Sequence, residues 1–105
     1  MPNKIFDGTS VEVDAQGFFQ QPEQWREAMA PEIAKEAGID ILNDAHWQVI
    51  RFMRSRYLEA GAAPSLRGLG KQSGVPIKTL YELFPKGPAK LAALIGGIPK
   101  PRGCI

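Results

Sequence analysis

The chain has 105 residues, of which 44% are hydrophobic and 23% charged, and its formal net charge is +2. These values suit one soluble globular domain with a modest core, and no apolar run approaches the roughly 20 residues of a membrane span or the apolar region of a secretory signal. One cysteine and one histidine exclude an internal disulfide and argue against a structural metal site, so we expect a cytoplasmic protein without a membrane anchor, metal or cofactor.

The N-terminal residues predict a small antiparallel sheet. Residues 4–6 and 10–13 are short β-prone segments, and the turn pair Asp7 and Gly8 separates them. Val11 and Val13 alternate with polar residues, as strands with one buried face do. A second turn at residues 14–17 leads to Phe18 and Phe19, which we expect to add a third short strand. The segment therefore predicts a β-hairpin or a three-stranded β-meander.

The next segment predicts two short helices or one bent helix. Pro22 is a favourable first residue of a helix, and a core-facing stripe repeats every four residues: Trp25, Met29 and Ile33. Pro31 falls inside this stripe and should break or kink the helix near Ala30. Gly38 is expected to end the second piece.

A longer helix is predicted from Asn43 or Asp44, either of which can cap it, to about Ala60, with Gly61 as its stop. Its apolar face is broad, which suggests a central helix contacted on more than one side. The residues of this face are Trp47, Val49, Ile50, Phe52, Met53 or Arg54, Tyr57 and Leu58. His46 near the start is either a proton shuttle or a residue of the first turn that lies on the surface or is satisfied by hydrogen bonds, and we favour the second interpretation.

Three shorter helices should follow. Ser65 can cap one that runs to about Gln72, Pro76 opens another, and Pro88 starts a last one that reaches about Ile95. We therefore expect a mostly helical α+β fold, in which a small N-terminal sheet packs on five or six helices. Residues 1–97 form the predicted domain, and residues 98–105 form a flexible C-terminal arm.

Residues 66–84 have the character of a helix-turn-helix, in which a short helix, a tight turn at Gly74 and a second helix pack together. Residues 74–85 resemble the recognition half of TetR-type repressors. The second helix offers few groups that could read bases, chiefly Lys78, Thr79 and Glu82. Because this geometry is also a common way of packing two helices, direct binding of nucleic acid is a minor alternative.

Charge is distributed unevenly along the chain. Residues 1–64 carry six Lys and Arg against ten Asp and Glu, whereas residues 65–105 carry seven against one. A basic C-terminal part can attract nucleic acid, an anionic substrate or an acidic protein partner, or it can be a plain solvated surface. We favour the attraction of a partner.

The only cysteine, Cys104, stands one residue from the end of the chain. Pro99 and Pro101 favour an extended, stiff backbone before it. Lys100 and Arg102 place positive charge near the sulfur and favour its thiolate, although the terminal carboxylate opposes them. These residues predict either an arm that carries one nucleophile or a tail whose cysteine has no role.

Two segments resemble a known family. The sequence LYELFPKGPAK at residues 80–90 and GIPKPRGCI at residues 97–105 is similar to the hallmark of the DsrC/TusE family. The family comprises the gamma subunit of dissimilatory sulfite reductase and a sulfur-relay protein. The similarity extends over most of the chain, including the N-terminal hairpin and the segments around Trp47 and Pro64.

The resemblance implies a sulfurtransferase-type persulfide carrier rather than a stand-alone enzyme. Cys104 would accept sulfur from a TusBCD-like donor complex and deliver it to an acceptor, by resemblance the enzyme that makes 2-thiouridine at the tRNA wobble position. Six cations are candidates for guiding anionic sulfur groups or acidic partner surfaces: Arg51, Arg67, Lys86, Lys90, Lys100 and Arg102.

The chain also departs from the family pattern. Dissimilatory members carry a second cysteine eleven residues before the first, and here that position is Ala93. One cysteine cannot close a disulfide within the arm or hold a trisulfide between two cysteines. A single-cysteine, TusE-like relay is therefore favoured over a carrier associated with sulfite reductase, which stays the alternative.

Overall fold

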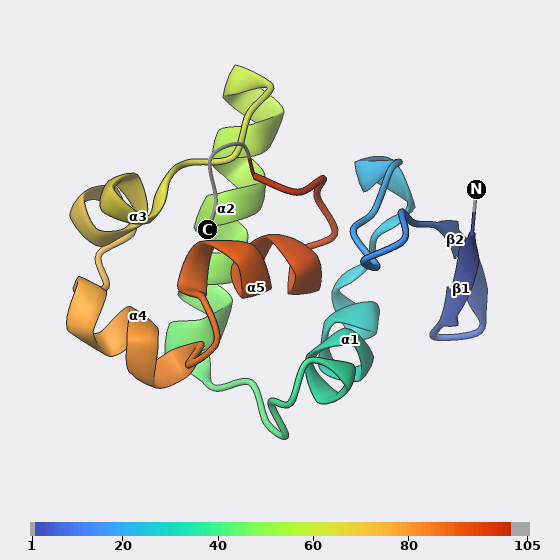
Figure 1. The fold of residues 1–105 in the computed structure, drawn as a ribbon, viewed down its shortest axis with the longest axis horizontal. Helices are drawn as coiled ribbons and strands as arrows, with labels where there is room; N and C mark the ends of the chain where they lie inside the picture. Colours follow the sequence, from blue (N-terminus) through green and yellow to red (C-terminus); the bar gives the residue numbers. More distant parts are fainter. Residues whose placement is uncertain (1, 102–105) are drawn as a thin grey trace.

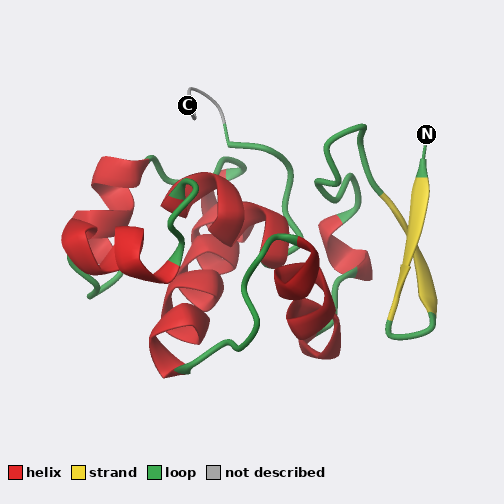
Figure 2. Ribbon diagram, turned by 60° about the horizontal axis from the view of Figure 1, so that its bottom comes forward, coloured by secondary structure: helices red, strands yellow, loops and turns green. Residues whose placement is uncertain are grey.

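The computed structural model describes residues 2–101, whereas residue 1 and residues 102–105 lie outside the described part. The described chain forms a two-stranded hairpin and five α-helices, and so confirms a mostly helical α+β fold. The strands are β1 (Asn3–Phe6) and β2 (Thr9–Glu12). The helices are α1 (Ala30–Glu36), α2 (Asp44–Ala60), α3 (Leu66–Gln72), α4 (Ile77–Leu83) and α5 (Pro88–Ile95). The hairpin and the α3–α4 pair lie at opposite ends of the molecule (Figures 1 and 2).

The hairpin follows its predicted turn. Asn3 pairs with Glu12 and Phe6 with Thr9, which leaves Asp7 and Gly8 as a two-residue loop. Both loop residues have positive φ, 50° and 72°, as the central residues of a type I′ turn require. The third strand expected at Phe18 and Phe19 is reduced to one bridge between Val13 and Phe19, because the chain then turns into the helical layer. The sheet is therefore a hairpin and not a meander.

The break before α1 comes earlier than predicted. Two short 3-10 turns, Pro22–Gln24 and Glu27–Met29, precede the helix, and Arg26 between them is extended. Pro31 lies in the first turn of α1, where its missing N–H leaves no helical hydrogen bond unmade. The interruption therefore lies at residues 25–26 rather than at Ala30.

Helix α2 begins and ends where its capping residues indicate. Asn43 accepts a hydrogen bond from the His46 N–H, and the His46 ring accepts one from the Asn43 N–H, which makes a reciprocal capping box. The other ring nitrogen bonds the Leu83 carbonyl at 3.0 Å, so the histidine is buried and fully hydrogen-bonded, as favoured above. Gly61 ends the helix with φ of 75°. Leu58 is 65% exposed, so the apolar face is narrower than predicted.

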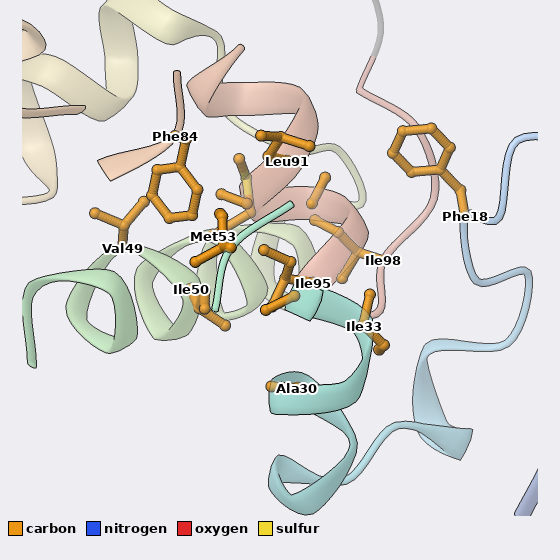
Figure 3. Close-up of a cluster of buried hydrophobic side chains, with 14 of the residues drawn as sticks. Phe18, Ala30, Ile33, Val49, Ile50, Met53, Phe84, Leu91, Ile95 and Ile98 are labelled. Atoms are coloured by element: carbon orange, nitrogen blue, oxygen red, sulfur yellow. The ribbon is translucent and has the colours of Figure 1, made fainter. Parts of the chain in front are cut away.

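The central helix is α5 rather than α2. It contacts α1, α2, α3 and α4, and six of its eight residues are buried. Figure 3 shows Ile95 among Ile50 and Met53 of α2 and Ile33 of α1. Because α5 is almost wholly apolar, it can be covered on several sides at once.

Helices α3 and α4 form the expected helix-turn-helix. Ser65 caps α3 through the Gly68 N–H, and Gly74 in the connecting turn has φ of +85°. The two helices cross closely at Gly70, where an added Cβ would lie 3.0 Å from Ile77 Cδ1 and closer still to Cγ1. A glycine is therefore required at this crossing.

The packed chain continues beyond α5. Ile98 is completely buried and Pro101 is buried, so side chains of the core extend past the boundary predicted at residue 97. Arg102, Cys104 and the rest of the predicted arm lie outside the described residues, and the arm itself stays a prediction.

Candidate functional site

The root of the C-terminal segment is the end of α5, where the helix terminates in a Schellman motif. The Ile98 N–H donates to the Ala93 carbonyl at 3.1 Å, and the Gly97 N–H donates to the Leu94 carbonyl at 3.3 Å. Gly97 has φ of +67°, the left-handed conformation that this motif needs. The glycine pair at residues 96–97 thus ends the helix and turns the chain toward the tail.

Two side chains from distant parts of the sequence bind the carbonyls that the motif leaves free. Trp25 Nε1 donates to the Ile95 carbonyl at 2.9 Å. Arg54 Nη1 donates to the Gly96 carbonyl at 2.7 Å and reaches the Gly97 carbonyl at 3.4 Å. Together these bonds give partners to three consecutive carbonyls, which a helix end otherwise leaves to water.

The Arg54 and Trp25 side chains also bind each other, and we call them the Arg54–Trp25 pair. The guanidinium carbon lies 4.2 Å from the centroid of the indole, a cation–π geometry. Arg54 Nη2 further reaches the Pro22 carbonyl at 3.4 Å, so the guanidinium joins the segment before Trp25 to the end of α5. Partial burial lowers the pKa of the guanidinium through desolvation, but an arginine keeps its charge at neutral pH. That charge complements the negative end of the helix dipole.

Gly97 fits this arrangement only because it has no side chain. A Cβ there would lie 2.5 Å from Trp25 Cγ and 2.6 Å from Trp25 Cβ. At Gly96, an added Cβ would lie 2.8 Å from the Ala92 carbonyl oxygen and 3.4 Å from Arg54 Cγ. Gly97 is therefore the residue that lets Trp25 approach the backbone directly.

The predicted guiding cations come from different elements of the fold. Arg51 on α2 is exposed, lies over the Trp47 ring at 5.2 Å and pairs with Glu27 at 3.2 Å. Arg67 on α3, Lys86 between α4 and α5, and Lys100 are exposed, whereas Lys90 on α5 is half-buried. Arg102 and Cys104 lie outside the described residues. Among the described cations of this set, only Arg51 forms an ion pair.

Sequence reasoning placed Arg54 on the apolar face of α2 but did not select it as a site residue. Its neighbours along that face, Ile50 and Tyr57, are one helical turn away. A cation within an apolar stripe could therefore have indicated that Arg54 binds a buried group. The glycine pair at the end of α5 was a second signal, since it allows close approach of another group.

Ala93, which occupies the position of the second family cysteine, is completely buried in α5. Its carbonyl accepts the Ile98 N–H described above. The position therefore belongs to the core at the root of the tail. Within residues 2–101 no three side chains of the metal-binding types come together, and no described helix has the length and apolarity to cross a bilayer.

The fold and this root define a small helical domain whose last helix leads, through a bound glycine pair, into a cysteine-bearing C-terminal segment. The chain belongs to the DsrC-like protein family, whose model matches residues 5–105. This agrees with the resemblance noted in the sequence.

Similar proteins include those named Sulfurtransferase TusE from Escherichia coli strain K12 and Shigella dysenteriae, each 43% identical over 96% of this chain and 98% of the relative. Among solved structures, the oxidized gamma subunit of the dissimilatory sulfite reductase (DsrC) from Archaeoglobus fulgidus is 35% identical, with a TM-score of 0.83 over 99% of this chain and all of the other. Allochromatium vinosum DsrC is 37% identical, with a TM-score of 0.82 over 98% of this chain and 97% of the other.

Proposed function

We propose that the protein is a sulfur carrier that holds sulfane sulfur as a persulfide on Cys104. The observation that carries this proposal is the position of the only cysteine, three residues beyond the packed Pro101, in a chain 43% identical to proteins named Sulfurtransferase TusE. A thiol at the end of a short tail can enter the active site of another protein, which a thiol within a folded body cannot do.

The transfer chemistry is balanced without an external oxidant or reductant. The Cys104 thiolate attacks the outer sulfur of a donor persulfide, a new S–S bond forms, and the donor's inner sulfur leaves as a thiolate. In the second step, an acceptor thiolate attacks the outer sulfur on Cys104, and the Cys104 sulfur is the leaving group. Lys100 and Arg102 favour the thiolate that each step needs or releases.

The charges on the described surface support recognition of anionic groups. Arg67, Lys86 and Lys100 are exposed, and none of them forms an ion pair with another described residue. We propose that these cations, with Lys90, Arg102 and Arg51, attract persulfide anions or acidic partner surfaces. Arg51 already forms an exposed ion pair with Glu27, which a partner would have to share or replace.

We further propose that the donor is a TusBCD-like complex in the cytoplasm and that the acceptor is a tRNA-thiolating enzyme. The curated relatives named Sulfurtransferase TusE are more similar to this chain, at 43% identity, than are the structures of dissimilatory sulfite reductase proteins, at 34–37%. Ala93 also deprives the chain of the second cysteine that the family resemblance assigns to dissimilatory members. A carrier associated with sulfite reductase is the alternative.

The test uses the single cysteine. The protein is incubated with a low-molecular-weight persulfide, and its intact mass is then measured. We expect additions equal to the mass of one or more sulfur atoms in the natural chain, removal of these additions by dithiothreitol, and none in Cys104→Ser. An unmodified mass in the natural chain would exclude the carrier function.

The helix-turn-helix supports a second, less favoured candidate, direct binding of nucleic acid. Lys78 and Glu82 on α4 are exposed, as are Arg67 and Lys71 on α3. Binding through these groups would weaken steeply with salt and would persist in Cys104→Ser. Failure to retain any DNA duplex or tRNA at moderate salt would eliminate this candidate.

A further inference from the structure

We propose that Arg54 and Trp25 are positioning residues that fix the place from which the cysteine-bearing tail leaves the body. The functional meaning of this proposal rests on the carrier function proposed above, whereas the anchoring itself rests on the contacts at the end of α5. These contacts come from α2 and from the 3-10 region before α1: Arg54 is 42 positions from Gly96, and Trp25 is 70 positions from Ile95.

An ordinary helix end does not need this arrangement. The Schellman motif already satisfies the Ala93 and Leu94 carbonyls through backbone N–H groups. The Arg54–Trp25 pair binds the next three carbonyls, including that of Gly97, which lies two residues beyond the last residue of α5. The pair therefore acts on the exit of the tail as well as on the end of the helix.

The Arg54–Trp25 pair fixes the orientation of the backbone at residues 95–97 as well as its position. The guanidinium is held over the indole by a cation–π contact, and the indole N–H donates to the Ile95 carbonyl. Because Gly97 lacks a side chain, its backbone lies directly against the indole. Two flat groups that bind successive peptide units leave the chain little freedom to rotate before Ile98.

A fixed root limits the reach of the thiol. Cys104 stands seven positions after Gly97, so even if residues 98–101 left their packed positions and the chain were fully extended, the thiol-bearing residue would stay within about 24 Å of Gly97. If residues 95–97 detached as well, the last turn of α5 would lengthen the tail and its origin would shift. The thiol would then sample a larger volume, and a smaller fraction of its positions would suit attack in the active site of a partner protein.

The first measurement is amide hydrogen exchange by NMR on the full chain. The variants are Arg54→Lys, which keeps the charge but loses the planar fork, and Trp25→Phe, which keeps a ring but loses the N–H. We expect exchange at Gly97 and Ile98 to become about tenfold faster in each variant, because local opening there loses one to two hydrogen bonds. Amides in the middle of α2 should change less than twofold. Arg56→Lys, on the same helix but without a described hydrogen bond to the tail, is the matched control.

The second measurement follows the tail itself. One nitroxide is attached to Cys104 and one to the exposed position Ser55→Cys, and the distribution of distances between them is measured by pulsed electron resonance. Measured well below the melting temperature of both proteins, the double variant Arg54→Lys/Trp25→Phe should give a broader distribution than the parent, and Arg56→Lys should not. A role confined to fold stability would not broaden it.

The outcomes separate the two proposals. Unchanged exchange at residues 97–98, or equal acceleration at every amide, would overturn the anchoring, and so would an unchanged distance distribution. Selective acceleration with a broadened distribution would establish it. Absence of sulfur uptake by Cys104 alongside selective acceleration would refute the carrier function while leaving the anchor in place.

Discussion

Replacing Gly97 by alanine tests the close approach of Trp25 to the backbone. The substitution places a Cβ on a residue with φ of +67°, a conformation that costs an L-residue about 1–2 kcal/mol. The same Cβ would overlap Trp25 Cγ and Cβ, so the indole has to move. Its displacement removes the hydrogen bond to Ile95, worth about 0.5–1.5 kcal/mol, and the stacking of Arg54, worth about 0.5–2 kcal/mol. We therefore expect a total loss of roughly 2–5 kcal/mol in the free energy of unfolding.

Gly61→Ala is the matched control, because Gly61 also ends a helix with positive φ, 75°, yet nothing lies within 4 Å of its added Cβ. It should lose only the conformational part, about 1–2 kcal/mol. Urea unfolding followed by circular dichroism measures both losses, and indole fluorescence in a Trp47→Phe background reports any displacement of Trp25. Equal losses in the two variants would show that Trp25 does not press on Gly97 and would refute the reasoning.

Three further substitutions probe other contacts. Gly70→Ala should destabilise the natural chain because the new Cβ would overlap Ile77. In an Ile77→Ala background, the same substitution should stabilise the chain by about 1 kcal/mol, because alanine has the higher helix propensity. Changes of the same sign in the free energy of urea unfolding in both backgrounds would contradict this. His46→Ala should cost about 2–3 kcal/mol because it removes the capping bond and the bond to Leu83, whereas His46→Gln should retain part of the cap; thermal melts that rank the two equally would reject the capping box. Ala93→Cys should add a buried thiol that iodoacetamide modifies only in denaturant. The mass of the folded variant should therefore increase by one adduct, at Cys104. Two adducts on the folded variant would refute the burial of this position.

Short-range signals predicted most element boundaries. Asn43, Gly61, Ser65 and Pro88 stand where the structure begins or ends helices, because caps and stops act through hydrogen bonds and backbone angles within one turn. The hairpin turn at Asp7 and Gly8 was predictable for the same reason.

Features that depend on tertiary packing were less accessible. The spacing of Trp25, Met29 and Ile33 predicted one helical face. In the structure, Arg26 is extended and interrupts the helix, and Trp25 instead donates a hydrogen bond to the Ile95 carbonyl. The central position of α5 could not be read from its eight residues, because an apolar helix gives no preferred face.

The candidate site divides in the same way. Cys104 was identified because it is the only cysteine in the sequence and because its segment resembles the DsrC/TusE family. Its role stays a proposal because it lies outside the described residues. The contact of Arg54 with Gly96 joins residues 42 positions apart, and nothing local to either residue specifies it. Sequence reasoning could mark a charged residue in an apolar stripe but could not name its partner.

The central position of α5 has a mechanical consequence. Tension applied to the tail would pass through the buried Pro101 and Ile98 to the end of α5, where Arg54 of α2 binds the Gly97 carbonyl and Trp25 binds the Ile95 carbonyl. Because α5 touches four other helices, the load then spreads through the whole helical layer instead of peeling one segment from an edge. A pull on the tail should therefore leave the packed interior intact.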